Sequence, residues 1–304
     1  GTIMPMLLIS VLGLSWLVMG KPIQFPWEIH SFLPKQIDFN NLGYFTGIIF
    51  GLMGLEMSAI HAGDVANPKK SFPKALLWST LIILVTLIFS SLSIAMVVPN
   101  VKLDVVTGFI DAFKIFLQAY HLQSAINLVV ISIVIGSLAG AGAWMLGPSR
   151  ALSLALNDTY LPAWCHKTNG YDAPVAVLLC QGIISTVLSI SFFLLPTVES
   201  AYWFLSALSA QLALMFYFLL FLAAICLRYQ HNPAPRAFKI PFGNVGIIVI
   251  AGMGLLTCFV GIVIGFILPS NIQTLKPTVF AELILAGLIV LSLPVMMLRF
   301  KSRD

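Results

Sequence analysis

The stretch FGLMGLEMSAIHAGD, residues 50–64, places polar groups inside an apolar run that is long enough to cross a membrane. The run extends over residues 42–65, and about 20 apolar residues suffice to span a bilayer. It carries a carboxylate at Glu56 and glycines at Gly51 and Gly54. An ionisable group at membrane depth is costly and usually faces a cavity or a partner. The stretch is therefore a candidate functional site within a membrane span.

Composition places the whole chain in the membrane. Of its 304 residues, 59% are hydrophobic and 9% are charged, whereas a soluble domain carries about 25% charged residues. Residues 105–121 form an amphipathic segment that we expect to lie as a helix at the membrane surface. The sequence predicts an all-α multispan membrane protein with about eight transmembrane helices. The predicted spans are residues 1–19, 42–65, 75–98, 126–156, 173–195, 201–227, 245–268 and 279–298.

The basic residues are distributed unevenly between the two sides of the predicted bundle. Eleven of the 16 Lys and Arg residues fall in one set of alternate loops and five in the other. The positive-inside rule places the richer set, which includes residues 64–75 and the C-terminus, in the cytoplasm. This distribution accounts for the net charge of +5 without a nucleic-acid partner.

Glu56 and the neighbouring glycines each allow two interpretations. Burial disfavours the charged form of a carboxylate, so Glu56 is a candidate proton-sensitive group. Alternatively, Glu56 bonds to neighbouring backbone and only fixes the packing. Gly51 and Gly54 indicate either an interrupted helix whose half-helix ends hold a charged substrate, or close packing against another helix.

Two further spans carry residues with similar alternatives. Trp144 lies in mid-span next to Gly140 and Gly142, and it either packs against another helix or forms a gate at a substrate cavity. Gln211 and Tyr217 are expected to form hydrogen bonds within the bundle. The sequence contains no HExxH, Walker or dinucleotide-binding motif, and its four cysteines form no CxxC pair. We therefore expect no enzyme activity, no cofactor and no metal.

Several blocks resemble a transporter family. GLEMSAIHAGDVANPKKSFPKAL (54–76) resembles the signature of the amino acid–polyamine–organocation transporters. LSIAMVVPN (92–100) and AWMLGPSRAL (143–152) resemble the bacterial glutamate/GABA antiporters in particular. The likeness extends over nearly the whole chain. It implies a leucine-transporter-like fold, in which two inverted five-span repeats are followed by two further spans.

The resemblance also assigns the predicted spans to places in that fold. Residues 1–304 are expected to form a single transmembrane domain that is N-terminally truncated and lacks the family's first four spans. Residues 1–19 correspond to span five, residues 42–227 to the second inverted repeat (spans six to ten), and residues 245–298 to spans eleven and twelve.

The resemblance further implies roles for individual residues. Glu56 matches a glutamate linked to proton or pH response. The expected substrate-binding residues are an aromatic at the helix break, four residues of an unwound segment and two residues that line the cavity: Phe50, Gly51, Leu52, Met53, Gly54, Trp144 and Tyr217. Two positions depart from the glutamate/GABA pattern, because Gly140 replaces an acidic residue and Ala213 replaces a second tyrosine. These departures argue against glutamate as the substrate.

The resulting prediction is a secondary amino acid antiporter of the glutamate/GABA-exchanger type that works by alternating access. Its expected partners are small amino acid substrates (glutamate, GABA or related) and the lipid bilayer, with no nucleic acid, and the sequence is compatible with a homo-oligomer. We expect a multi-pass protein of the bacterial inner membrane with a cytoplasmic C-terminus. The alternatives are a non-transporting truncated fragment, a half-transporter that needs its missing N-terminal spans, and a pore.

Overall fold

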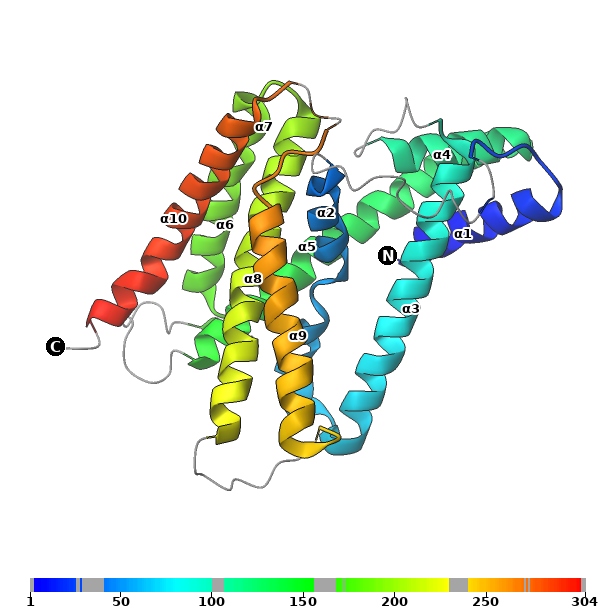
Figure 1. Cartoon of the computed structure of the whole chain (residues 1–304). Helices are drawn as coiled ribbons and strands as arrows, with labels where there is room; N and C mark the ends of the chain where they lie inside the picture. The colour runs from blue at the N-terminus through cyan, green and yellow to red at the C-terminus, as the bar shows by residue number, and fades with distance from the viewer. Residues whose placement is uncertain are drawn as a thin grey trace. The chain divides into compact units, whose positions relative to one another are not determined.

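A computed structural model describes most of the chain, and the described residues are helices and their connections (Figure 1). The described residues are 3–25, 28, 41–99, 107–155, 168–171, 173–229, 240–270, 272 and 274–301. The helices are α1 (Ile3–Val18), α2 (Gly43–Leu52), η3 (Leu55–Asp64), α3 (Pro68–Val97), α4 (Gly108–Ala119), η5 (Gln123–Ala125), α5 (Ile126–Ala155), α6 (Val175–Ser189), α7 (Ser191–Leu194), α8 (Val198–Tyr229), α9 (Gly243–Ile264) and α10 (Pro277–Lys301). Over these residues no named strand forms, and the all-α class is confirmed.

The long apolar helices agree with a multi-pass membrane protein. Five helical segments are long and apolar enough to cross a bilayer, namely Pro68–Val97, Gln123–Leu152, Val175–Leu194, Val198–Tyr229 and Gly243–Ile264. Ile3–Val18 and Pro277–Leu293 are shorter apolar helices. The remaining predicted span, residues 42–65, is divided between α2 and η3. Each of the eight predicted spans therefore contains a helix, although their lengths differ.

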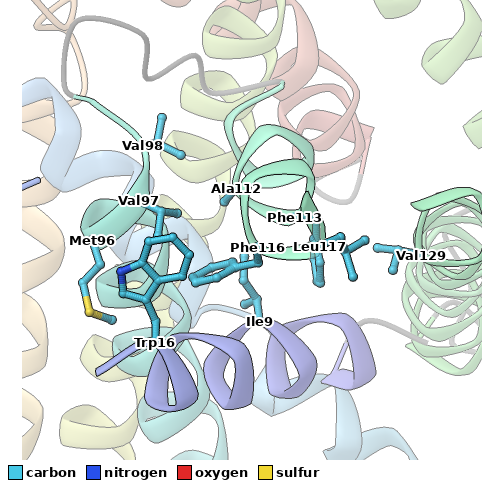
Figure 2. Close-up of a cluster of buried hydrophobic side chains, with 10 residues drawn as sticks. All are labelled: Ile9, Trp16, Met96, Val97, Val98, Ala112, Phe113, Phe116, Leu117 and Val129. Atoms are coloured by element: carbon cyan, nitrogen blue, oxygen red, sulfur yellow. The ribbon is translucent and has the colours of Figure 1, made fainter. Parts of the chain in front are cut away.

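The described chain forms two compact units. The first consists of Gly1–Gln36, Met57–His61 and Lys74–Ser185. Its core lies where α1, α4 and the end of α3 meet, and Figure 2 shows Trp16 and Phe116 facing each other between α1 and α4. Their ring centroids lie 5.4 Å apart in an edge-to-face arrangement. Phe113 and Phe116 are fully buried in this core.

Helix α4 is amphipathic as predicted, but protein covers its apolar face. Phe113 and Phe116 of this helix pack into the core with Ile9 and Trp16 of α1. The phenylalanine side chains are buried against neighbouring helices, and the position of α4 at the membrane surface stays a prediction. The polar side of α4 carries Asp111 and Lys114, whose carboxylate and ammonium lie 2.9 Å apart. The hydrogen bond from Lys114 holds the pKa of the Asp111 carboxyl below its usual value.

Lys21 connects the C-terminal end of α1 to α4 through three contacts. Gly20 has a φ of 63°, a left-handed conformation that turns the chain after the helix. The Lys21 ammonium then lies 5.0 Å from the ring centroid of Trp16 and 4.7 Å from that of Tyr120. It also donates a hydrogen bond of 3.1 Å to the carbonyl of Ala119. One cation thus joins two aromatic rings and a helix end.

The second unit consists of Ile37–Glu56, Ala62–Pro73 and Thr186–Asp304. Within it α8 and α9 run side by side (Figure 1). Gln211 of α8 is fully buried, and its Nε2 donates a 2.8 Å hydrogen bond to the carbonyl of Ile262 on α9. The expected bond within the bundle is therefore confirmed for Gln211. A second apolar cluster joins α8 to α10 through side chains that include Leu208, Phe280 and Ile284.

Candidate functional site

The apolar run over residues 42–65 is interrupted, and one glycine permits the interruption. Helix α2 ends at Leu52, and Met53 is extended with φ −77° and ψ 158°. Gly54 follows with a φ of 104°, which residues with a Cβ rarely adopt. The 3₁₀ helix η3 then begins at Leu55. The resemblance implied an unwound segment of four residues, but Gly51 and Leu52 remain helical and only Met53 and Gly54 leave the helix.

The break brings two helix ends together in mid-run. The last turn of α2 leaves carbonyl groups without helical partners, and the first turn of η3 leaves N–H groups in the same condition. These ends carry opposite partial charges, negative on α2 and positive on η3. Phe50 stands in the last turn of α2 with 40% of its side chain exposed. Next to it, Gly51 has open space where a Cβ would stand.

Glu56 lies in the first turn of η3 and closes the break. Its Oε2 accepts a 3.1 Å hydrogen bond from the backbone N–H of Gly54, two residues earlier. The same oxygen accepts a 2.5 Å hydrogen bond from the hydroxyl of Tyr217 on α8. This distance is typical of a hydroxyl bound to an ionised carboxylate. The Gly54 N–H also lies 3.2 Å from the Tyr217 hydroxyl, so the three groups form a closed triangle.

This triangle joins Gly54 and Glu56 to Tyr217, which lies far from them in the sequence. The Glu56 carboxylate does bond to neighbouring backbone, which was the structural alternative, and it also binds a side chain from α8. Tyr217, expected to line a cavity, is the donor of that second bond. An ionised carboxylate only accepts hydrogen bonds, whereas a protonated one also donates. A proton on Glu56 would therefore rearrange the contacts that hold the break against α8.

Trp144 lies in α5, within the first unit. Its side chain is 52% exposed, and a Cβ at Gly140 or Gly142 would meet no atom within 4 Å. Its backbone carbonyl accepts a 3.5 Å hydrogen bond from Nε2 of Gln181 on α6. Sequence reasoning did not identify Gln181. The available signal was Pro148, four residues after Trp144, because a proline there removes the N–H that would bind this carbonyl.

Two polar residues of the opening stretch lie outside the described side chains. His61 and Asp64 belong to η3, but the structure describes only the path of their backbone. Among the described side chains, no group of three His, Cys, Asp or Glu residues is placed to hold a metal ion.

Comparison with known proteins identifies relatives over almost the whole chain. A family model described as amino acid permease matches residues 1–290. An uncharacterised transporter of Legionella pneumophila is 42% identical over 290 residues, which cover 95% of this chain and 62% of that protein. A glutamate/gamma-aminobutyrate antiporter of Lactococcus lactis is 26% identical over 293 residues, covering 95% of this chain and 58% of the relative.

An amine transporter is also similar. A probable agmatine/putrescine antiporter of Lactococcus lactis is 27% identical over 225 residues, covering 73% of this chain and 47% of the relative. This chain therefore spans less than two thirds of the length of each of these three relatives.

Proposed function

We propose that this chain, which belongs to the amino acid permease family, exchanges small amino acids or related amines across a bacterial membrane by alternating access. The family is one of transporters and not of enzymes. The observation that carries the proposal is the triangle of Gly54, Glu56 and Tyr217 at the break between α2 and η3. A proton-sensitive carboxylate at a helix break can link the occupancy of a site to its conformation.

The helix ends at the break suit a substrate that carries both an amino group and a carboxylate. The carbonyl end of α2 attracts an ammonium group, and the N–H end of η3 attracts a carboxylate. The proposed substrate-binding residues are Phe50, Gly51, Leu52, Met53, Gly54, Trp144 and Tyr217. Relatives are named as antiporters of glutamate and gamma-aminobutyrate and of agmatine and putrescine, which supports an amino acid or amine as cargo.

Glu56 would couple this site to pH. In its ionised form the carboxylate holds Tyr217 and the Gly54 N–H, which fixes the break against α8. A proton from the more acidic side neutralises the carboxylate and weakens both bonds, because they are strongest when the acceptor is charged. The break is then free to change shape as the site opens to the other side. We place the protein in the bacterial inner membrane with its C-terminus in the cytoplasm, in line with its basic loops.

Counterflow in proteoliposomes tests the exchange reaction. The full-length protein is reconstituted, and uptake of labelled substrate is measured against trapped glutamate, gamma-aminobutyrate, glutamine or putrescine. We expect uptake only where an accepted substrate is trapped inside. Uptake at the same rate into empty vesicles would indicate a pore, and an absence of uptake with every pair would contradict the proposed function.

Glu56→Gln tests the pH coupling. The amide keeps the shape of the side chain but cannot take up a proton, so we expect folding to be retained and the pH dependence of exchange to flatten. Glu282→Gln is the matched control, because Glu282 is a carboxylate in α10, another apolar helix. A Glu56→Gln variant whose pH profile equals that of the wild type would rule out Glu56 as the coupling group.

A further inference from the structure

Helix α5 contains a proline one turn after Trp144. Pro148 lies inside the helix. Proline has no backbone N–H, so the carbonyl four residues earlier loses its α-helical partner. That carbonyl belongs to Trp144. An apolar environment makes an unpaired carbonyl costly, so another donor is expected to bind it.

Gln181 of the neighbouring helix α6 supplies the donor. Its Nε2 lies 3.5 Å from the carbonyl oxygen of Trp144. Helix α6 is apolar, and none of its residues is buried within the protein. A lone amide on such a helix is stabilised when it finds a polar partner on another helix. The carbonyl that Pro148 releases is the partner that the structure provides.

The helical turn of α5 directly after Trp144 is held by other contacts. Ser149 is 1% exposed, and its hydroxyl donates a 3.0 Å hydrogen bond to the carbonyl of Leu146. Before Trp144, by contrast, Gly140 and Gly142 leave open space along the helix. The backbone at Trp144 thus lies between a fixed turn and a stretch with little side-chain support, and Gln181 reaches it from outside the helix.

We propose that Gln181 is a positioning residue, which sets the orientation of Trp144 by binding the carbonyl that Pro148 leaves free. The proposal rests on the proposed function, in which Trp144 lines the substrate cavity. In this proposal Gln181 acts on the backbone of Trp144 and not on the substrate. Its removal changes the path of α5 at Trp144 and so changes how well substrate binds.

A double-mutant cycle isolates this bond. Gln181→Leu removes the donor, and Pro148→Ala restores the backbone N–H that would take over the Trp144 carbonyl. The thermal unfolding midpoint and exchange kinetics are measured for both single variants, the double variant and the wild type. The 3.5 Å distance is at the long end for a hydrogen bond, so we expect Gln181→Leu to raise KM about 2- to 5-fold with a smaller change in kcat. In the Pro148→Ala background the same change should have little further effect on KM or on the unfolding midpoint.

A proline inside a different helix provides the control. Pro73 lies inside α3, and Pro73→Ala restores an N–H far along the chain from Trp144. Gln181→Leu should therefore act in full, and additively, in the Pro73→Ala background. Equal effects of Gln181→Leu on the unfolding midpoint in the wild-type and Pro148→Ala backgrounds would overturn the proposal.

The two measurements separate this proposal from the proposed function. Coupling in the unfolding midpoints with an unchanged KM would show a bond that only stabilises the fold, and the positioning role would be rejected. If the wild-type protein exchanges no substrate, the proposed function fails and the positioning role falls with it. The unfolding cycle then still establishes whether Gln181 and Pro148 act on the same carbonyl.

Discussion

The hydroxyl of Tyr217 lies 2.5 Å from the carboxylate of Glu56, although 161 positions separate the two residues in the sequence. The bond joins the beginning of η3 to the middle of α8, and the Gly54 N–H approaches both oxygen atoms. A membrane span that is broken in the middle loses its own backbone bonds at that point. The side chains of Glu56 and Tyr217 replace part of the backbone hydrogen bonding that the break removes. One of the two, the Glu56 carboxylate, is a group that can take up a proton.

Tyr217→Phe should change the pH dependence of exchange. The substitution removes the hydroxyl donor and keeps the ring, so the Glu56 carboxylate loses one of its two hydrogen bonds at the break. A hydrogen bond to a charged group contributes about 1.5–3 kcal/mol, so its loss should be measurable in the exchange rate. The measurement is the rate of counterflow between about pH 4 and pH 9.

Tyr202→Phe is the control for this prediction. Tyr202 lies on the same helix with 41% of its side chain exposed. Its hydroxyl can be removed without touching Glu56, so the pH profile should stay in place. A Tyr217→Phe variant with an unshifted midpoint would show that the bond to Glu56 has no part in pH coupling.

Gly54→Ala should destabilise the protein, whereas Gly51→Ala should not. Gly54 has a φ of 104°, and placing a side chain in a left-handed conformation costs about 1–2 kcal/mol. Gly51 is three residues earlier but helical, with no atom within 4 Å of an added Cβ, so alanine there is expected to be neutral or to stabilise by about 0.5–1 kcal/mol. Thermal unfolding of the two purified variants gives the comparison. Equal losses would place the structural requirement for glycine in helix packing and not in the break.

Hydropathy predicted the helices well because a membrane span is a local property of about 20 residues. The predicted span over residues 75–98 begins seven residues too late, since α3 starts at Pro68. Proline is well suited to the first position of a helix, but the lysines that follow it suggested a loop. The break at Gly54 was one of the two alternatives that the glycines allowed, because glycine permits a backbone conformation that other residues avoid.

The partners of the candidate site were not predictable in the same way. Nothing in the sequence near Glu56 indicates which of the polar residues in later spans would meet it. Tyr217 and Gln211 are six residues apart on α8, yet one binds Glu56 and the other binds Ile262. Only the rotation of α8 against its neighbours decides between them. The apolar face of α4 gave a similar difficulty, because amphipathicity shows that a face is covered but not whether lipid or protein covers it.

Lys21→Met should loosen the attachment of α4 to α1. The methionine keeps much of the side-chain volume but removes the charge that lies over the rings of Trp16 and Tyr120 and the bond to the Ala119 carbonyl. A loss of about 1–2 kcal/mol in the free energy of unfolding is expected for a cation that serves two rings. Lys114→Met is the control, since its ion pair with Asp111 is exposed and contributes less than about 1 kcal/mol. Equal destabilisation by the two variants would contradict a specific role for the aromatic pair.

Gly265→Ala should disrupt the packing of α8 against α9 through one side chain. An added Cβ would meet the amide nitrogen of Gln211 and lie 2.8 Å from its Cδ. Gln211 is fully buried and its Nε2 is bound to the Ile262 carbonyl, so the amide cannot move without losing that bond. Overpacking of this kind typically costs about 1–3 kcal/mol. Gly252→Ala, on the same helix with no atom within 4 Å of its added Cβ, should be neutral or stabilising by comparison.

Gln211→Ala tests whether the close approach of Gln211 is the reason that Gly265 is required. By itself it removes the bond to Ile262 and leaves a cavity, so it should destabilise the protein. Combined with Gly265→Ala, it clears the space that the new methyl group needs, and the double variant should be less destabilised than the sum of the two single variants. Thermal unfolding of the four proteins measures this coupling. Strict additivity would mean that Gly265 is required for a reason other than the close approach of Gln211, such as the turn of backbone that ends α9 at Ile264.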